Sequence, residues 1–122
     1  MEIVEFTKVE HQLMQVLWKL EKAFVKEIIQ ELPEPKPAYS TVSTMIRILE
    51  TKGAVAYEAF GKTHRYYPLI SKEEYMRFEA DKFLDNYFSN SIQDMFSFFV
   101  NEKKIDLKDA EQLLNMIDKI KD

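Results

Sequence analysis

The chain has 122 residues, enough for one domain or two small ones, and 46% of them are hydrophobic, enough for a packed core. It contains no cysteine, which excludes disulfides, thiolate metal sites and a cysteine nucleophile. No run of about eighteen apolar residues is present, and the N-terminus lacks the basic and apolar regions of a secretory signal. We therefore expect a cytoplasmic protein that does not enter the membrane.

The net charge of −4 is unevenly distributed along the sequence. Residues 1–70 contain nine basic and nine acidic side chains, whereas residues 71–122 contain eight basic and twelve acidic ones and carry the whole excess. Between Lys36 and Tyr66 the balance is +3. Because affinity for DNA depends on charge placed locally at phosphates, the overall acidity does not exclude a nucleic-acid partner.

Three helices are expected in the first part of the chain. Thr7 and Glu10 have the spacing of a capping box and open the first helix. A short second helix fits Val25 to Leu32 and ends at the prolines of residues 33–37, because proline cannot donate a backbone hydrogen bond. The third helix extends from about Tyr39 to Lys52.

The only two glycines of the chain mark the next elements. Gly53 is the expected left-handed residue after the third helix. Gly61 separates residues 54–60 from residues 63–69, and both runs are rich in Val, Tyr, Phe and Thr, which predicts a β-hairpin. Three helices followed by such a hairpin are typical of a winged helix, in which the second and third helices form a helix-turn-helix.

From Ser71 onward the sequence predicts helices only. A second capping box, Ser71 with Glu74, opens one helix, another covers about Ser91 to Asn101, and a third starts at Asp106. We therefore predict a mostly α fold with a small β-hairpin wing. It consists of a winged helix-turn-helix DNA-binding domain, residues 1–70, and a three-helix dimerisation domain, residues 71–122.

The outward face of the third helix is unusual for a solvated helix. Opposite the apolar stripe that contains Val42 and Ile46 it carries one charge, Arg47, among five Ser and Thr side chains. A poorly formed surface helix is one interpretation, since Ser and Thr do occur on solvated faces. Against it, these residues lower helix propensity, and short side chains let a helix approach the major groove of DNA closely. We therefore predict a recognition helix.

The predicted hairpin adds basic and polar side chains beside this helix. Lys62 at its tip and Thr63, His64 and Arg65 on the return strand suit phosphates at the edge of the groove. A winged helix that binds another protein and ignores DNA remains the alternative, because fold alone does not determine function. The predicted DNA-binding residues are Tyr39, Ser40, Thr41, Ser43, Thr44, Arg47, Lys62, Thr63 and Arg65.

Residues 41–75, "TVSTMIRILETKGAVAYEAFGKTHRYYPLISKEEY", with "VLW" upstream and "FFVNEKKIDLKDAEQLL" downstream, resemble the penicillinase and methicillin-resistance repressor family. The resemblance extends from about Thr7 to Ile120. It implies a winged-helix repressor that binds an operator in double-stranded DNA and dimerises through its C-terminal helices. It also places Thr41, Thr44 and Arg47 at recognition-helix positions that face the groove.

The chain departs from this family at two points. In the family's resistance branch, a sensor protease inactivates the repressor by cutting an Asn–Phe bond in the middle tail helix, whereas the corresponding bond here is Phe98–Phe99. The copper-responsive branch has a cysteine pair near its C-terminus, and this chain has no cysteine. The sequence therefore leaves the inducing signal open, and with it the sensor protease as a partner.

Eight aromatic residues lie between Tyr75 and Phe99. A ligand pocket is one interpretation of this density, and a helical core is the simpler one. Because three short helices in about 50 residues form a marginal core on their own, we expect a homodimer that covers the apolar surface. The predicted dimerisation residues are Tyr87, Phe88, Ile92, Phe96, Phe99, Leu113, Leu114 and Ile117.

Catalytic and metal-binding patterns are weak throughout the sequence. His11 and His64 are far apart and have no carboxylate at a ligand spacing, so we expect no metal site. Acidic pairs such as Glu73 with Glu74 are typical of solvated helix faces. Neither a Gly-rich phosphate loop nor a Ser–His–Asp pattern is present. We therefore predict that the protein is not an enzyme and needs no cofactor.

Overall fold

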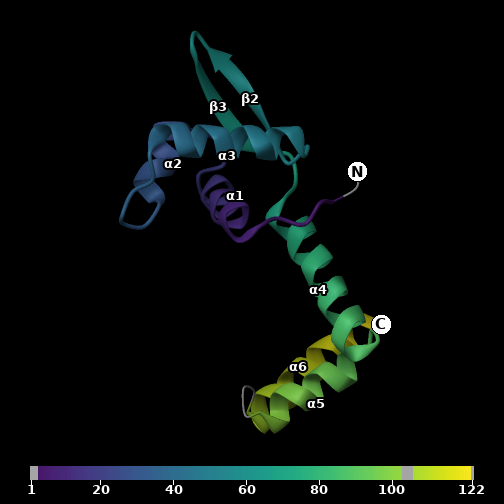
Figure 1. Ribbon diagram of the computed structural model, residues 1–122. Coiled ribbons are helices and arrows are strands. Elements are labelled where there is room, and N and C mark those ends of the chain that lie inside the picture. Colours follow the sequence, from purple (N-terminus) through teal and green to yellow (C-terminus); the bar gives the residue numbers. More distant parts are fainter. Residues whose placement is uncertain (1–2, 103–105, 122) are drawn as a thin grey trace. The chain divides into compact units, whose positions relative to one another are not determined.

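The computed structural model describes residues 3–102 and 106–121, without the side chains of residues 110, 114 and 117–121 (Figure 1). The chain divides into two compact units, Met1–Met76 and Arg77–Asp122. Within the described residues, no helix is both long and apolar enough to cross a membrane. The elements in chain order are α1 (Lys8–Leu20), β1 (Ala23–Phe24), α2 (Val25–Glu31), α3 (Tyr39–Thr51), β2 (Val55–Phe60), β3 (Thr63–Pro68), α4 (Lys72–Phe88), α5 (Ile92–Asn101) and α6 (Leu107–Lys121).

Helix α1 begins at the expected capping box. The backbone N–H of Glu10 donates to Thr7 Oγ1 over 3.2 Å, and the backbone N–H of Thr7 donates to Glu10 Oε1 over 2.8 Å. These bonds satisfy two amides that the first turn leaves without helical partners. Leu13, Met14 and Leu17 then place the buried face of α1 in the centre of the first unit.

Helices α2 and α3 pack on α1, and different interactions terminate their C-terminal ends. At the C-terminal end of α2, Lys36 Nζ donates to the carbonyl oxygens of Gln30 and Leu32, where a cation also complements the helix dipole. Helix α3 buries Val42 and Ile46 and is followed by Gly53 at φ +79°. A residue with a side chain is strained in that left-handed conformation, which explains the glycine.

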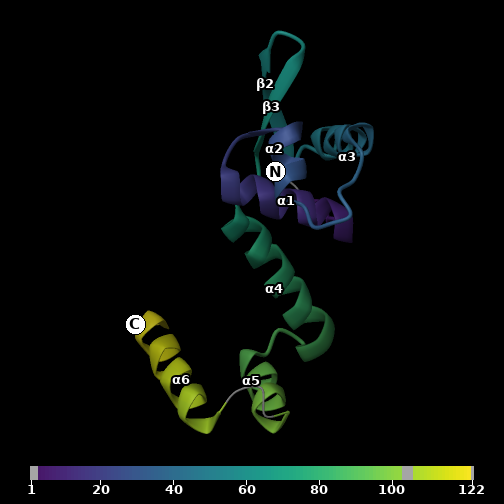
Figure 2. The ribbon, with the colours of Figure 1, turned by 90° about the vertical axis from the view of Figure 1, so that its left-hand side faces the viewer.

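The hairpin β2–β3 is antiparallel, and it extends beyond the three helices in both views of the first unit (Figures 1 and 2). Gly61 lies at its tip with φ +62°. The short strand β1 pairs with β3 and completes a three-stranded sheet in the order β1-β3-β2. Strand β1 is not predicted from the sequence, because two residues are too short to show an alternating pattern. The predicted winged-helix fold is confirmed.

The first unit includes the beginning of α4. The indole N–H of Trp18 donates to the carbonyl oxygen of Ile70 over 2.8 Å, and the expected capping box of Ser71 with Glu74 opens α4. Tyr75 is only 2% exposed and stacks on Phe6 at 4.4 Å between ring centroids. Tyr75, which the sequence analysis counted among the tail aromatics, therefore packs in the core of the first unit.

The second unit contains the rest of α4, with α5 and α6. From Arg77 to Glu102 no residue is buried. Ser91 caps α5, since the backbone N–H of Asp94 donates to Ser91 Oγ. Apolar side chains nevertheless make up most of α5, and Phe98 is among the exposed ones. This stretch therefore has a large apolar surface and no buried centre of its own.

Candidate nucleic-acid interface

Helix α3 presents its hydroxyl-rich face to solvent. Tyr39, Ser40, Thr41 and Thr44 are exposed, and Ser43 is half-buried. Thr44 Oγ1 donates to the carbonyl oxygen of Ser40 over 2.9 Å, so its hydrogen is used within the helix. Its two lone pairs can still accept a hydrogen bond from the amino group of adenine or cytosine at a base edge.

Arg47 lies on the same face, one turn after Ser43 and Thr44. It is exposed, and among the described residues no hydrogen bond or ion pair engages its guanidinium group. A guanidinium group of this kind can donate two parallel bonds to guanine O6 and N7. Ile48 beside it is also exposed and offers an apolar contact for a thymine methyl group. Ile48 is not among the residues predicted from the sequence, because it lies at the flank of the helix, between the buried stripe and the polar face.

The local charge balance is less favourable to DNA than the sequence indicates. Of the basic residues between Lys36 and Tyr66, Lys36 is bonded to the end of α2, and Lys52 forms a 2.7 Å ion pair with the buried Glu10. Burial by itself raises the pKa of Glu10, but the hydrogen bonds from Lys52 and from the Thr7 backbone outweigh it and leave that pKa below 4.5. The ammonium groups of both lysines are therefore bonded within the protein.

The two faces of the hairpin hold different predicted residues. Tyr66 is buried, and its burial, followed by the Glu50 carboxylate of α3, raises the pKa of its phenol. The same face carries His64, whose ring stacks on Tyr57 at 3.9 Å between centroids. Because side chains alternate along a strand, Arg65 lies on the opposite face, beside Glu58. The structure thus brings His64 toward α3 and separates Arg65 from it.

Arg65 has an unusual environment on that second face. Its Nε atom is buried and has no hydrogen-bond partner among the described residues. Its cross-strand neighbour Glu58 forms an ion pair with Lys22, which lowers the pKa of the Glu58 carboxyl. The side chain is half-buried, so less of it is available to a phosphate than the sequence analysis assumed.

The tip of the hairpin and the start of α3 line one hollow. Lys62 and Thr63 are exposed, and Thr63 Oγ1 donates to the carbonyl oxygen of Phe60 over 2.9 Å. Thr63, His64 and Tyr39 share a cavity of about 320 Å³ with the first residues of α2. The N-terminal end of α3 and the return strand of the hairpin therefore contribute to one hollow. Within residues 3–102 and 106–121 no cluster of three or more His, Asp or Glu side chains is placed to hold a metal ion.

Proteins of known function are similar to this chain in sequence over nearly its whole length. A family model described as the penicillinase repressor matches residues 6–119. The chain is 23% identical over 120 residues to the "Penicillinase repressor" of Bacillus licheniformis, which covers 98% of this chain and 94% of the relative. It is 22% identical over 116 residues to the "Methicillin resistance regulatory protein MecI" of Staphylococcus aureus (strain N315), which covers 94% of each.

A solved structure agrees with the first unit. The solution structure of the DNA binding domain of the repressor BlaI superposes with a TM-score of 0.53 and 29% sequence identity, over 61% of this chain and 92% of that one. The family match covers far more than half of the sequence and includes both units. The chain therefore belongs to the penicillinase repressor family, whose members are winged-helix, DNA-binding transcriptional repressors and not enzymes.

Proposed function

We propose that this chain is a homodimeric repressor that reads a (pseudo)palindromic operator with α3 and positions itself through the hairpin. The observation that carries the proposal is the outward face of α3, where short hydroxyl side chains surround an exposed Arg47 without an ion pair among the described residues. Arg47 and Thr44 contact base edges, whereas Lys62 and Thr63 contact phosphates. Ser40 and Thr41 at the start of α3 are suited to phosphate oxygens, because backbone amides at a helix N-terminus favour anions.

The second unit supports a two-fold assembly. Tyr87 is 73% exposed and Ile92 is 45% exposed, although both are apolar enough to favour burial. Phe88, Phe96 and Phe99 are half-buried, and Leu113 is exposed. The side chains of Leu114 and Ile117 lie outside the described residues. A second copy of the tail would remove this surface from water at about 25 cal/mol per Å² of apolar area, and two-fold symmetry would double the DNA contacts.

The proposal is tested by selecting duplexes from a random pool with the full-length protein. We expect an enriched sequence with two related half-sites, footprinted symmetrically, and an affinity that falls as the salt concentration rises. A protein-interaction module would bind all duplexes equally weakly. Absence of any enriched sequence would overturn the DNA-reading role of α3.

Arg47→Ala is expected to lower the affinity for the selected operator by about 1–3 kcal/mol, because a bidentate contact to guanine is lost. The melting temperature should stay within a degree or two of the parent, since the side chain is exposed. Fluorescence anisotropy with operator and scrambled duplexes measures the effect. Lys62→Ala serves as the comparison, since loss of a phosphate contact weakens operator and scrambled DNA alike. Equal operator binding by the Arg47→Ala variant and the parent would contradict the base contact.

Cleavage by the family's sensor protease is expected to be slow or absent at Phe98–Phe99. The resemblance places this bond where the resistance branch has Asn–Phe, and here it lies inside α5, which must unfold locally to enter a protease. Incubation with such a protease and intact-mass measurement give the result, with Phe98→Asn as the matched variant. Rapid cleavage of the parent at this bond would show that asparagine is dispensable.

A further inference from the structure

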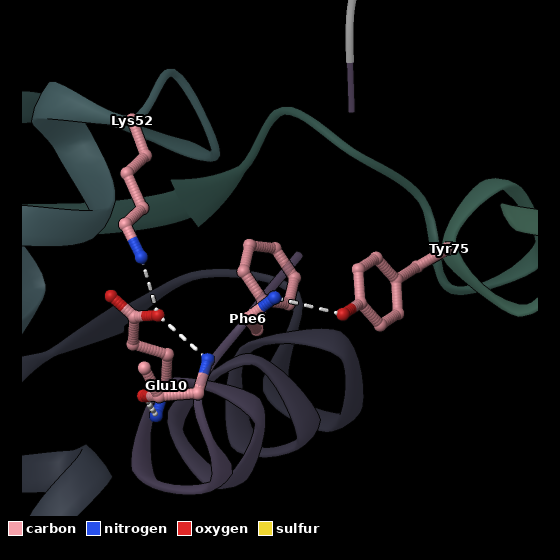
Figure 3. A network of polar contacts seen from close by, with 5 residues as sticks. Phe6, Glu10, Lys52 and Tyr75 are labelled. Carbon is pink, nitrogen blue, oxygen red and sulfur yellow. Dashed lines mark hydrogen bonds and ion pairs between the residues drawn. The ribbon is translucent and has the colours of Figure 1, made fainter. Parts of the chain in front are cut away.

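A chain of polar contacts joins the first turns of α4 to the end of the recognition helix (Figure 3). The hydroxyl of Tyr75 accepts a hydrogen bond from the backbone N–H of Phe6 over 2.9 Å. The next residue, Thr7, donates its N–H to Glu10 Oε1, and the same oxygen accepts a bond from Lys52 Nζ over 2.7 Å. Lys52 is the C-cap residue of α3. The segment before α1 therefore contacts α4 directly and reaches α3 through one carboxylate.

This network is buried for most of its length. Tyr75 and Glu10 are each 2% exposed, and Phe6 is buried as well. The rings of Phe6 and Tyr75 are nearly parallel, with an angle of 14° between them, and Trp18 and His11 flank Tyr75 at 6.0 and 5.8 Å between centroids. Moving Tyr75 out of this site would leave the Phe6 amide without its partner in an apolar environment, which is unfavourable. The start of α4 is therefore held as part of the first unit.

We propose that Tyr75 is a positioning residue for operator spacing. It fixes the start of the tail helix to the unit that carries α3, so that a pair of chains joined through their tails accepts half-sites at one separation. This inference rests on the proposed two-fold function and adds to it the residue that determines half-site spacing.

The physical basis is the effective concentration of the second DNA-binding unit at its half-site. A joint with a defined geometry concentrates that unit at the matching separation and excludes it from others, whereas a loose joint spreads it over many separations. Loosening the joint should therefore lower affinity at the matching spacing and reduce the penalty at other spacings. A change that only destabilised the fold would instead weaken binding to every duplex in proportion.

The experiment compares the full-length parent with Tyr75→Phe, which removes only the hydroxyl, and Tyr75→Ala, which also removes the stacked ring. Tyr67→Phe is the control, because no hydrogen bond to its hydroxyl is found among the described residues. Three duplexes derived from the selected operator are used: the operator itself, the same with about 5 base pairs inserted between the half-sites, and a single half-site. The insertion of half a helical turn places the half-sites on opposite faces of the duplex.

For the parent and Tyr67→Phe we expect strong preference for the operator over the inserted duplex. For Tyr75→Phe we expect the ratio of operator affinity to inserted-duplex affinity to fall by roughly tenfold, with half-site affinity and dimer content unchanged. For Tyr75→Ala we expect the same ratio to fall further. A Tyr75→Phe variant that keeps the parental ratio, or one that loses affinity for all three duplexes equally, would overturn the inference alone. A parent that binds the operator no better than the half-site would overturn the proposed two-fold function.

Discussion

Replacing Lys52 by methionine is expected to lower the free energy of unfolding by about 3 kcal/mol at neutral pH, because it leaves the buried Glu10 carboxylate without its cation. The value is at the lower end for a buried pair, since the Lys52 side chain is 27% exposed and water reaches it. Urea unfolding of the full-length protein at one fixed concentration measures the change.

Lys19→Met is the matched control for this substitution. Lys19 also pairs with a glutamate, Glu31, at 2.7 Å, but its side chain is 68% exposed. Surface pairs of this kind contribute at most about 1 kcal/mol. An equal loss of stability in the Lys19→Met and Lys52→Met variants would contradict a special role for the buried pair.

The Lys52→Met effect should also depend on pH. In the parent the folded pKa of Glu10 lies below its unfolded value near 4.5, so the pair stabilises the protein above that pH and ceases to do so as the pH falls through the folded pKa. In the variant, burial raises the pKa of Glu10, and protonation relieves the unpaired charge in acid. The difference in unfolding free energy between parent and variant should therefore be largest near pH 7 and begin to shrink as the pH falls through the raised pKa of the variant. It should shrink further below about pH 4.5, where the parent loses the contribution of the pair. A constant difference would indicate lost packing of the lysine stem instead.

Truncation after Met76 is expected to give a monomer whose affinity for the full operator is lower by about 10²–10⁴, with half-site affinity unchanged, because the two DNA-binding units are no longer linked. Sedimentation and anisotropy measure the two effects. The cut follows Met76 because Tyr75 belongs to the core of the first unit. A cut after Ile70 would remove Tyr75 and expose Phe6. In the full-length protein, coupled folding and dimerisation should make the melting temperature rise with protein concentration.

Two substitutions in adjacent residues of α5 refine the dimer test. Ile92 is a predicted interface residue, whereas Gln93 beside it is exposed and polar. Ile92→Arg should raise the dimer dissociation constant by at least tenfold, since a charge would enter an apolar interface, and Gln93→Arg should leave it unchanged. A stable monomer for the full-length parent would remove the basis for the two-fold operator.

Local patterns predicted most of the fold, and contacts between distant residues account for the rest. Helix ends were predictable where a few neighbouring residues determine them. Examples are the capping boxes at Thr7 and Ser71 and the left-handed Gly53. Strand β1 was not predictable, because its two residues acquire strand geometry only by pairing with β3.

The same distinction applies to the candidate interface. The exposed face of α3 follows from helical periodicity and was predicted, apart from Ile48 at its flank. The pairing of Lys52 with Glu10 joins residues 42 positions apart, and the bond of Tyr75 to Phe6 joins residues 69 apart. No local pattern signals either contact. As a result, Lys52 was counted toward the charge near DNA, and Tyr75 was assigned to the tail.

The internal bonding of Lys36 and Lys52 has a consequence for how such a repressor would find its operator. The attraction of cations to phosphates is the same for every DNA sequence, whereas hydrogen bonds to base edges distinguish one sequence from another. With two nearby lysines used within the fold, binding depends more on the base-edge contacts proposed for Thr44 and Arg47, which form only on a matching sequence. Residence on unrelated DNA should therefore be brief, and the large excess of non-specific chromosomal sites would retain little of the protein.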